Sequence, residues 1–387
     1  MEHDNNLYWR DRAACTSYWE AVALDRTVDA KNRLLARMET VRVLLETHLQ
    51  DALVHAAFLL AETAANTEGE TIPADWAYNR GVLALQRHEF AQAFEYLGRA
   101  AIDGGDTAVR ARTDEALGRY YAAKGKLERA VACVEGAIAR WQAAAQPQEE
   151  GRAGCLLAKI LGLCGAWTRS REICDQSLEL AIAHDSPTLR LQALVGLVNS
   201  YVALEDGDMA AAFAFEALDA AVEPFDRYEI AQLQTALLRV ALQQEDWSAA
   251  EQLLQEGVMP HLALLTENNV LQAHIAASRG RLVYQKVLAG QESLTPQTLE
   301  QAEDFLVDAT VLCESQGMVY EYARTLYDLA QVYRLGMDTG DRYQYQGKRV
   351  RSLRLGLDAL DNFHNEPAER LKDLLNEALE QALTHHN

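Results

Sequence analysis

The sequence predicts an all-α protein built as a solenoid of antiparallel helix hairpins. Two segments, 81–101 and 118–141, both have the pattern of a helix, a tight turn and a second helix. A large apolar residue followed by a small one recurs where each second helix should begin. The 387 residues include only 22 Gly and 7 Pro, which argues against a loop-rich β architecture and against disorder.

The recurring pair sets the period of the expected hairpins. The pairs are Phe90/Ala93, Leu127/Ala130, Trp167/Ser170, Met209/Ala212 and Trp247/Ala250. Their small members recur at nearly even intervals along the chain, and a near-constant period in this range is typical of helical-hairpin solenoids. The large residue should anchor the second helix, and the small one should let two helices approach closely. We therefore expect Ala130, Trp167 and Trp247 to be buried.

The expected elements follow in chain order. Helices within 5–24 and 28–66 should cap the N-terminal end, and a polar linker should occupy 66–75. Five hairpins are expected at 75–103, 107–144, 149–184, 188–222 and 226–258. A sixth begins near 265 and is interrupted at 288–298, and a seventh starts at 320, turns at 337–341 and ends near 361. A polar helix at 367–384 should cover the last hairpin, since a terminal repeat has no neighbour to stack on. The expected domains are thus 1–66, 75–361 and 367–387.

Residues 114–137 resemble the tetratricopeptide repeat. The matching positions are Leu117, Gly118, Tyr121, Gly125, Ala130, Val134 and Ala137. The unit at 77–100 matches through Gly81, Ala93, Leu97 and Ala100, although Arg80 replaces the usual Leu. Later units depart further, because Ala158 and Leu238 stand where Gly is usual, and the repeats exceed the family's period of about 34 residues. The resemblance implies a right-handed superhelix whose first helices line a concave surface.

The stretch at 317–333, GMVYEYARTLYDLAQVY, also resembles the helical-repeat sensor arms of bacterial signal-transduction proteins. The resemblance covers roughly residues 75–360. The chain carries no GxxxxGK[ST] motif for nucleotide binding, and no DNA-reading helix pair is evident. It implies a signalling arm without the NTPase or DNA-binding segment of those proteins.

Charge and targeting features narrow the classes of partner and compartment. The net charge of −21 opposes general binding to nucleic acid or to anionic membranes. No secretory signal begins the sequence, and no uncharged apolar stretch is long enough to span a bilayer, so we expect a cytoplasmic protein. The six Cys form no CxxC pair and read as small buried residues rather than disulfides.

Motifs for metal binding and catalysis are missing from the sequence. It contains no HExxH, no GxSxG and no DDxxD of the kind an all-α terpene cyclase needs. Cys155, Cys164 and Cys174 fall in one hairpin but read as core residues, and His385 and His386 read as a solvated tail. The acidic runs at 204–208 and 300–304 read as a turn and a solvated helix face. We expect no cofactor, no metal and no enzymatic activity.

Basic residues at the concave positions of the first helices form the candidate binding site. The site comprises Arg112, Arg119, Arg152, Lys159, Arg239, Arg281 and Arg324, with His274 and Arg334 at related positions. Basic residues number 36 against 57 acidic ones, so a basic inner strip would run against the overall balance. Arg side chains bind carboxylates and phosphates well. Alternatively, these residues pair with Glu115, Asp328 and other acidic neighbours, or the register is shifted by one residue.

Two classes of function fit these features. The first is a non-catalytic interaction module that binds a peptide or protein segment with acidic groups in its concave groove. The second is a regulator that senses a small ligand or a peptide and changes the shape of the superhelix, since each repeat contacts only its neighbours.

Overall fold

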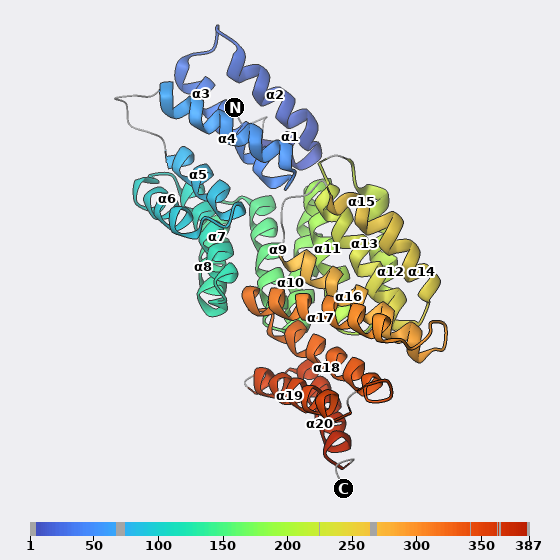
Figure 1. The fold of residues 1–387 in the computed structure, drawn as a ribbon. Helices are drawn as coiled ribbons and strands as arrows, with labels where there is room; N and C mark the ends of the chain where they lie inside the picture. Colours follow the sequence, from blue (N-terminus) through green and yellow to red (C-terminus); the bar gives the residue numbers. More distant parts are fainter. Residues whose placement is uncertain are drawn as a thin grey trace.

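The computed structural model describes residues 5–66, 74–223, 225–263, 269–340, 342–361, 363 and 365–384. All regular elements within these ranges are helices, which confirms the predicted all-α helical-repeat fold (Figure 1). The elements are α1 (Asn5–Arg10), α2 (Arg12–Leu24), α3 (Ala30–Glu46), α4 (Gln50–Asn66), α5 (Ala74–Gln86), α6 (Phe90–Asp103), α7 (Thr107–Ala123), α8 (Leu127–Ala143), α9 (Pro147–Leu163), α10 (Trp167–Ala183), α11 (Pro187–Ala203), α12 (Gly207–Ala220), α13 (Arg227–Gln243), α14 (Trp247–Gln252), the π-helix η1 (Leu253–Val258), α15 (Met259–Leu262), α16 (Asn269–Leu288), α17 (Pro296–Gln316), α18 (Val319–Gly336), α19 (Arg342–Leu360) and α20 (Glu366–Thr384).

Helices in the middle of the chain begin at a constant interval. From Thr107 to Trp247 the helices α7 to α14 begin at positions 107, 127, 147, 167, 187, 207, 227 and 247. The helices α7 to α11 and α13 are each 17 residues long, and a link of three residues usually joins one helix to the next. One hairpin therefore spans two such intervals, as from Thr107 to Pro147. Equivalent positions in successive hairpins are also two intervals apart.

The three-residue links share one backbone conformation. Their middle residues are Gly125, Ala145, Gly165, Asp185, Glu205 and Glu245, all with φ between 49° and 73°. The N–H after the middle residue bonds a carbonyl five residues earlier, as from Lys126 to Tyr121 (2.8 Å) and from Gln146 to Trp141 (3.0 Å). This bond and the left-handed residue are those of the Schellman motif, which satisfies the free carbonyls at a helix end. The same turn joins the two helices of a hairpin and also joins one hairpin to the next.

The small residues of the repeat lie where the second helix meets the first. Ala93, Ala130, Ala210 and Ala250 have no exposed surface and Ser170 is 3% exposed. The predicted pair Met209/Ala212 was wrong, because α12 begins at Gly207 and both Met209 and Ala212 are exposed. Asp206 caps that helix by accepting a hydrogen bond from the Met209 N–H (3.2 Å), so the buried small residue is Ala210.

Two other predictions from the repeat are confirmed. Trp167 and Trp247 are each 8% exposed at the first position of their helices. At Gly118 a Cβ would lie 2.5 Å from Cγ2 of Val134, so the glycine of the tetratricopeptide pattern permits the helices α7 and α8 to touch.

The N-terminal region is helical over the two ranges predicted, with two helices in each. Within 5–24 the break is at Asp11, whose side chain accepts a hydrogen bond from the Ala14 N–H (2.9 Å) and so starts α2. Within 28–66 the break is at 47–49, where His48 has φ 55°. Near 258, by contrast, the chain stays helical through η1 and α15 to Leu262. The expected linker lies largely outside the described residues, as do His385 and His386.

The array is curved so that segments distant in sequence come into contact. Helix α1 packs on α11, where the Thr188 hydroxyl donates to the backbone oxygen of Tyr8 (3.2 Å). Buried Arg12 pairs with Asp226 and, at 3.6 Å, with Glu229. Farther along, a Cβ on Gly317 would lie 3.0 Å from Cα of Gly125, so two turns from distant parts of the sequence touch. The N-terminal helices thus contact the middle of the array as well as its end, and the division into domains stays a prediction.

The corrected register predicts that enlarging one of two nearby alanines lowers stability and that enlarging the other does not. Ala210→Leu should lower the free energy of unfolding by about 1–3 kcal/mol, because a leucine overpacks the fully buried contact between α11 and α12. Ala212→Leu should change it by less than about 0.5 kcal/mol, since that side chain is exposed. Thermal or urea denaturation measures both, and equal losses would contradict the register.

The left-handed turns predict a gain at Ala145, an exposed residue with φ 51°. Ala145→Gly should raise the free energy of unfolding by about 0.5–1 kcal/mol, because glycine adopts this conformation without steric cost. Ala144→Gly is the matched control: Ala144 has φ −86°, so glycine there should only destabilise. A loss of stability at both positions would show that the turn carries no strain.

Candidate ligand-binding groove

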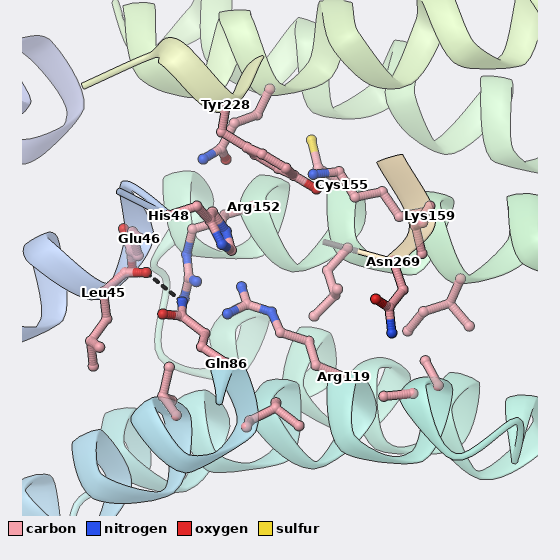
Figure 2. A pocket seen from close by; sticks show the side chains of 18 of the residues that line it. Leu45, Glu46, His48, Gln86, Arg119, Arg152, Cys155, Lys159, Tyr228 and Asn269 are labelled. Carbon is pink, nitrogen blue, oxygen red and sulfur yellow. Dashed lines mark hydrogen bonds between the residues drawn. The ribbon is translucent and has the colours of Figure 1, made fainter. Parts of the chain in front are cut away.

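The curled array encloses a groove made of two adjoining cavities. The first cavity has a volume of about 310 Å³ and is shown in Figure 2, and the second has about 190 Å³. Both are lined by Lys159, Leu163, Tyr228 and Val270, so they lie side by side. Such volumes lie in or near the range of small-ligand sites. We refer to the two cavities together as the groove.

The first helices of the hairpins supply most of the lining, as the resemblance implied. The first cavity takes residues from α5, α7, α9, α11, α13 and the start of α16, and α3 and the turn after it close one side. Because α7, α9, α11 and α13 begin at evenly spaced positions, Arg119, Lys159, Asn199 and Arg239 occupy equivalent places on them. All four line the groove. Asn199 was not among the groove residues predicted from the sequence.

Two cations in the groove have no acidic partner. Within the described part of the chain, neither Arg119 nor Lys159 forms an ion pair with a carboxylate, although ion pairs surround them. Figure 2 shows Arg119 extending from α7 into the first cavity, with Lys159 on α9. The Lys159 Nζ lies 5.9 Å from the ring centroid of Tyr228. These two side chains are the part of the predicted site that is free to bind a ligand.

Lys159 is exposed and lines both cavities. Partial loss of hydration among the surrounding protein atoms lowers the pKa of Lys159, Glu229 opposes that shift and the charge of Arg119 adds to it. An anion placed beside Arg119 and Lys159 would relieve the repulsion between them.

Two predicted site residues are engaged in buried ion pairs. Arg112 lies 3.3 Å from Glu39 and 3.7 Å from Glu149, and it does not line the groove. Arg152 lines the first cavity but pairs with Glu115 at 2.9 Å and Glu149 at 2.8 Å. The alternative of pairing with Glu115 therefore holds for Arg152, and neither arginine is available to a ligand.

The later members of the predicted strip are also occupied or lie elsewhere. Arg239 lines the second cavity and pairs with Glu321 at 2.9 Å, and His274 approaches the same carboxylate at 4.0 Å. Arg281 pairs with Asp328 at 2.5 Å and Arg324 lies over the Tyr327 ring; neither lines the groove. Arg334 is exposed. Of the predicted strip of basic residues, only Arg119 and Lys159 line the groove without an acidic partner among the described residues.

A buried network of charges explains why two unpaired cations are tolerated. It contains the carboxylates of Glu39, Glu46, Glu115, Glu149, Asp226 and Glu229 and the guanidinium groups of Arg12, Arg42, Arg112 and Arg152. Six carboxylates face four guanidinium groups, an excess of two negative charges. Arg119 and Lys159 add two positive charges nearby; Arg119 helps lower the pKa of Glu46.

His48 lies beside these cations. It follows α3 in the left-handed conformation, and its ring centroid is 4.4 Å from that of Tyr228 (Figure 2). Burial, together with the charges of Arg119 and Lys159, lowers the pKa of His48 to about 3, so the imidazole is neutral at pH 7. No pattern in the sequence pointed to His48, because a short break between helices placed it there.

Several amides in the groove have unused hydrogen-bonding atoms. Asn79 donates to the backbone oxygen of Met38 (3.0 Å) and Gln86 to that of Leu45 (2.5 Å), which leaves both amide oxygens without a partner in the described structure. Buried amides of this kind can bind the backbone of a ligand.

The described residues offer little for other chemistry. They contain no group of three or more His, Cys, Asp or Glu side chains that could hold a metal. All six cysteines are free thiols in the described structure, and burial raises the pKa of Cys155 in the first cavity to about 11, away from reactivity. None of the described helices has the length and apolar character needed to cross a bilayer.

No family model matches the chain, and no curated protein matches its sequence. Among solved structures, a Rap protein complexed with competence and sporulation factor aligns with a TM-score of 0.55 and 10% identity, covering 91% of this chain and 99% of its own. The apo form of RapI aligns with a TM-score of 0.50 and 13% identity, over 73% and 97%. NprR in complex with its cognate peptide NprX gives 0.48 and 13%, over 81% and 83%. The likeness to the two Rap proteins shows a shared helical-repeat fold.

The pKa of His48 should report on the cation beside it. In Arg119→Gln one positive charge is removed, the protonated imidazole is penalised less, and the pKa of His48 should rise from about 3. It should stay below the ordinary value of about 6.5, because burial is the larger cause. Titration of the imidazole C–H signal by NMR measures the shift. Arg140→Gln on the outer helix α8 should leave it unchanged, and an unmoved pKa in Arg119→Gln would mean that Arg119 does not face His48.

Proposed function

We propose that this protein is a non-catalytic interaction module that binds a peptide or protein segment in its groove. A carboxylate of the ligand lies between Arg119 and Lys159. The observation that carries the proposal is that two cations of a strongly acidic protein line the groove without an acidic partner among the described residues. A cytoplasmic location fits this role and rests on the sequence alone.

The chemistry of the two cations favours a carboxylate ligand. Charge-assisted hydrogen bonds from Arg and Lys to carboxylate are about twice as strong as neutral ones. Inside a groove they are screened less by salt than at an open surface. Loss of hydration, with a smaller contribution from the charge of Arg119, lowers the pKa of Lys159, and a ligand carboxylate beside the two cations opposes both effects.

The dimensions favour an extended chain. Groove residues on α9 run from Arg152 to Leu163, a segment that rises about 16 Å along the helix axis. An extended peptide advances about 3.3 Å per residue, so the groove accommodates about five residues. The amides of Asn79 and Gln86 lie where such a backbone would pass. The Rap structure with the same type of fold, which contains competence and sporulation factor, supports this reading.

A second role, sensing through a change of shape, is favoured by the way the groove closes. Its walls include α9 on one side and Asn269 and Gln316 on the other, and the array closes where Gly125 meets Gly317. A ligand that touches both walls would bias how tightly they close. A change in the radius of gyration on ligand binding, measured by small-angle X-ray scattering, would support this role.

A pool of synthetic pentapeptides tests the binding function directly. Peptides with free C-terminal carboxylates should be retained by the protein in affinity selection with mass spectrometry, and the same pool with amidated C-termini should be retained much less. The double variant Arg119→Gln, Lys159→Gln should lose most free-acid peptides while keeping its helix content. Retention should fall as salt rises.

Arg140 and Arg169 provide a matched control. Both are exposed and pair with acidic side chains on other helices, at 2.8 Å with Asp114 and 3.1 Å with Glu135. The double variant Arg140→Gln, Arg169→Gln removes the same charge and should bind as the unaltered protein does. Equal binding by both double variants, or no preference for the free acids, would contradict the proposal.

A further inference from the structure

The second cavity differs in chemistry from the first. Trp167, at the start of α10, is largely buried, and its indole Nε1 has no hydrogen-bond partner within the described residues. The amide Nε2 of Gln232 on α13 is likewise without a partner there. Both residues line the second cavity. The unused atoms of these two residues are donors that protein covers in the unliganded groove, whereas the unused amide atoms of Asn79 and Gln86, which line the first cavity, are acceptors.

Apart from Lys159, which lines both cavities, the charged residues of the second cavity already have partners. Arg239 pairs with Glu321 at 2.9 Å, and burial lowers the pKa of His274 to about 4, so this imidazole is neutral at pH 7. Most of the other lining residues are apolar. They include Ala158, Leu163, Ala236, Val270, Leu271 and Met318. Beyond Lys159, a charged group entering this space would lose its hydration without gaining a free counter-charge, so that part of the cavity favours an uncharged group.

An uncharged ligand group with an acceptor oxygen would complete the site. A buried donor without a partner is costly, and an acceptor supplied by a ligand removes that cost. A backbone carbonyl meets this need, while the apolar side chain of the same residue fills the space beside it. A volume of about 190 Å³ suits a large side chain.

We propose that the second cavity is a specificity subsite for one large apolar residue of the ligand, whose carbonyl oxygen accepts a hydrogen bond from Trp167 Nε1. The inference rests on the proposed binding of a peptide carboxylate by Arg119 and Lys159. From Lys159 to Leu163, which both cavities share, α9 rises about 6 Å, close to two residues of an extended chain. The ligand is then a free-acid peptide with its large apolar residue third from the C-terminus.

A positional library tests this assignment. The probe is a set of free-acid pentapeptides of Gly and Ser in which positions two, three and four are randomised in turn, with affinity selection on the full chain. Enrichment of Phe, Tyr, Leu and Met at position three is expected, with little preference at the other positions. Amidated peptides of the same sequences are the control for the carboxylate.

Two variants then test the donors. Trp167→Phe keeps a ring but removes the N–H, and Gln232→Leu removes the amide at similar size. Each should weaken the best enriched peptide about five- to tenfold, the usual worth of one hydrogen bond. Trp247→Phe is the matched control: it occupies the equivalent position two hairpins later with the same exposure but lines neither cavity. It should bind the peptide with unchanged affinity.

Each result decides between the two proposals. Free-acid peptides that bind through Arg119 and Lys159 without an apolar preference at position three would overturn the subsite and leave the proposed function intact. The same holds if Gln232→Leu, which avoids any change to the buried indole, binds as tightly as the unaltered protein. If no free-acid peptide is retained at all, both proposals fall.

Discussion

The structure depends on the backbone of its short links, in which the middle of three residues adopts the left-handed conformation. Because this turn has a fixed length and closes α7 to α11 and α13 with the same hydrogen bond, successive helices keep one phase over 107–252, and the shorter α12 with its longer link preserves that phase. Every first helix then presents the same face to the interior. That repetition places Arg119, Lys159, Asn199 and Arg239 along one groove, although they come from four different hairpins.

The curl of the array adds a second constraint, which is electrostatic. Bringing α1–α3 against α9, α11 and α13 buries many charges, and burial is tolerable only when charges are paired. The pairs Arg12–Asp226 and Arg152–Glu115 satisfy that requirement across long distances in sequence, and Glu149 pairs with Arg152 from the same helix. The excess of carboxylates is balanced by Arg119 and Lys159, which remain without direct partners among the described residues. The same burial that closes the groove therefore leaves its two cations available to a ligand.

Much of the fold was predictable, because helix periodicity and the recurrence of Ala or Ser are local patterns. The register failed at Met209, where the cap at Asp206 rather than apolar character decides the start of α12. The candidate site was only partly predictable. Repeat position identified Arg119 and Lys159 correctly as groove residues, but could not show that Arg112, Arg152 and Arg281 have acidic partners on other helices. His48 and Trp167 joined the groove through tertiary packing, which no local pattern encodes.

Hydrogen–deuterium exchange of the full chain, with and without the pool of free-acid pentapeptides, tests the central claim that the inner faces of the array bind a carboxylate-bearing chain. The account predicts added protection in α7, in α9 and at the start of α16, where residues from opposite walls line the groove, and unchanged exchange in the outer helices α8 and α12, which line neither cavity. Protection confined to outer helices, or a uniform change along the chain, would contradict it.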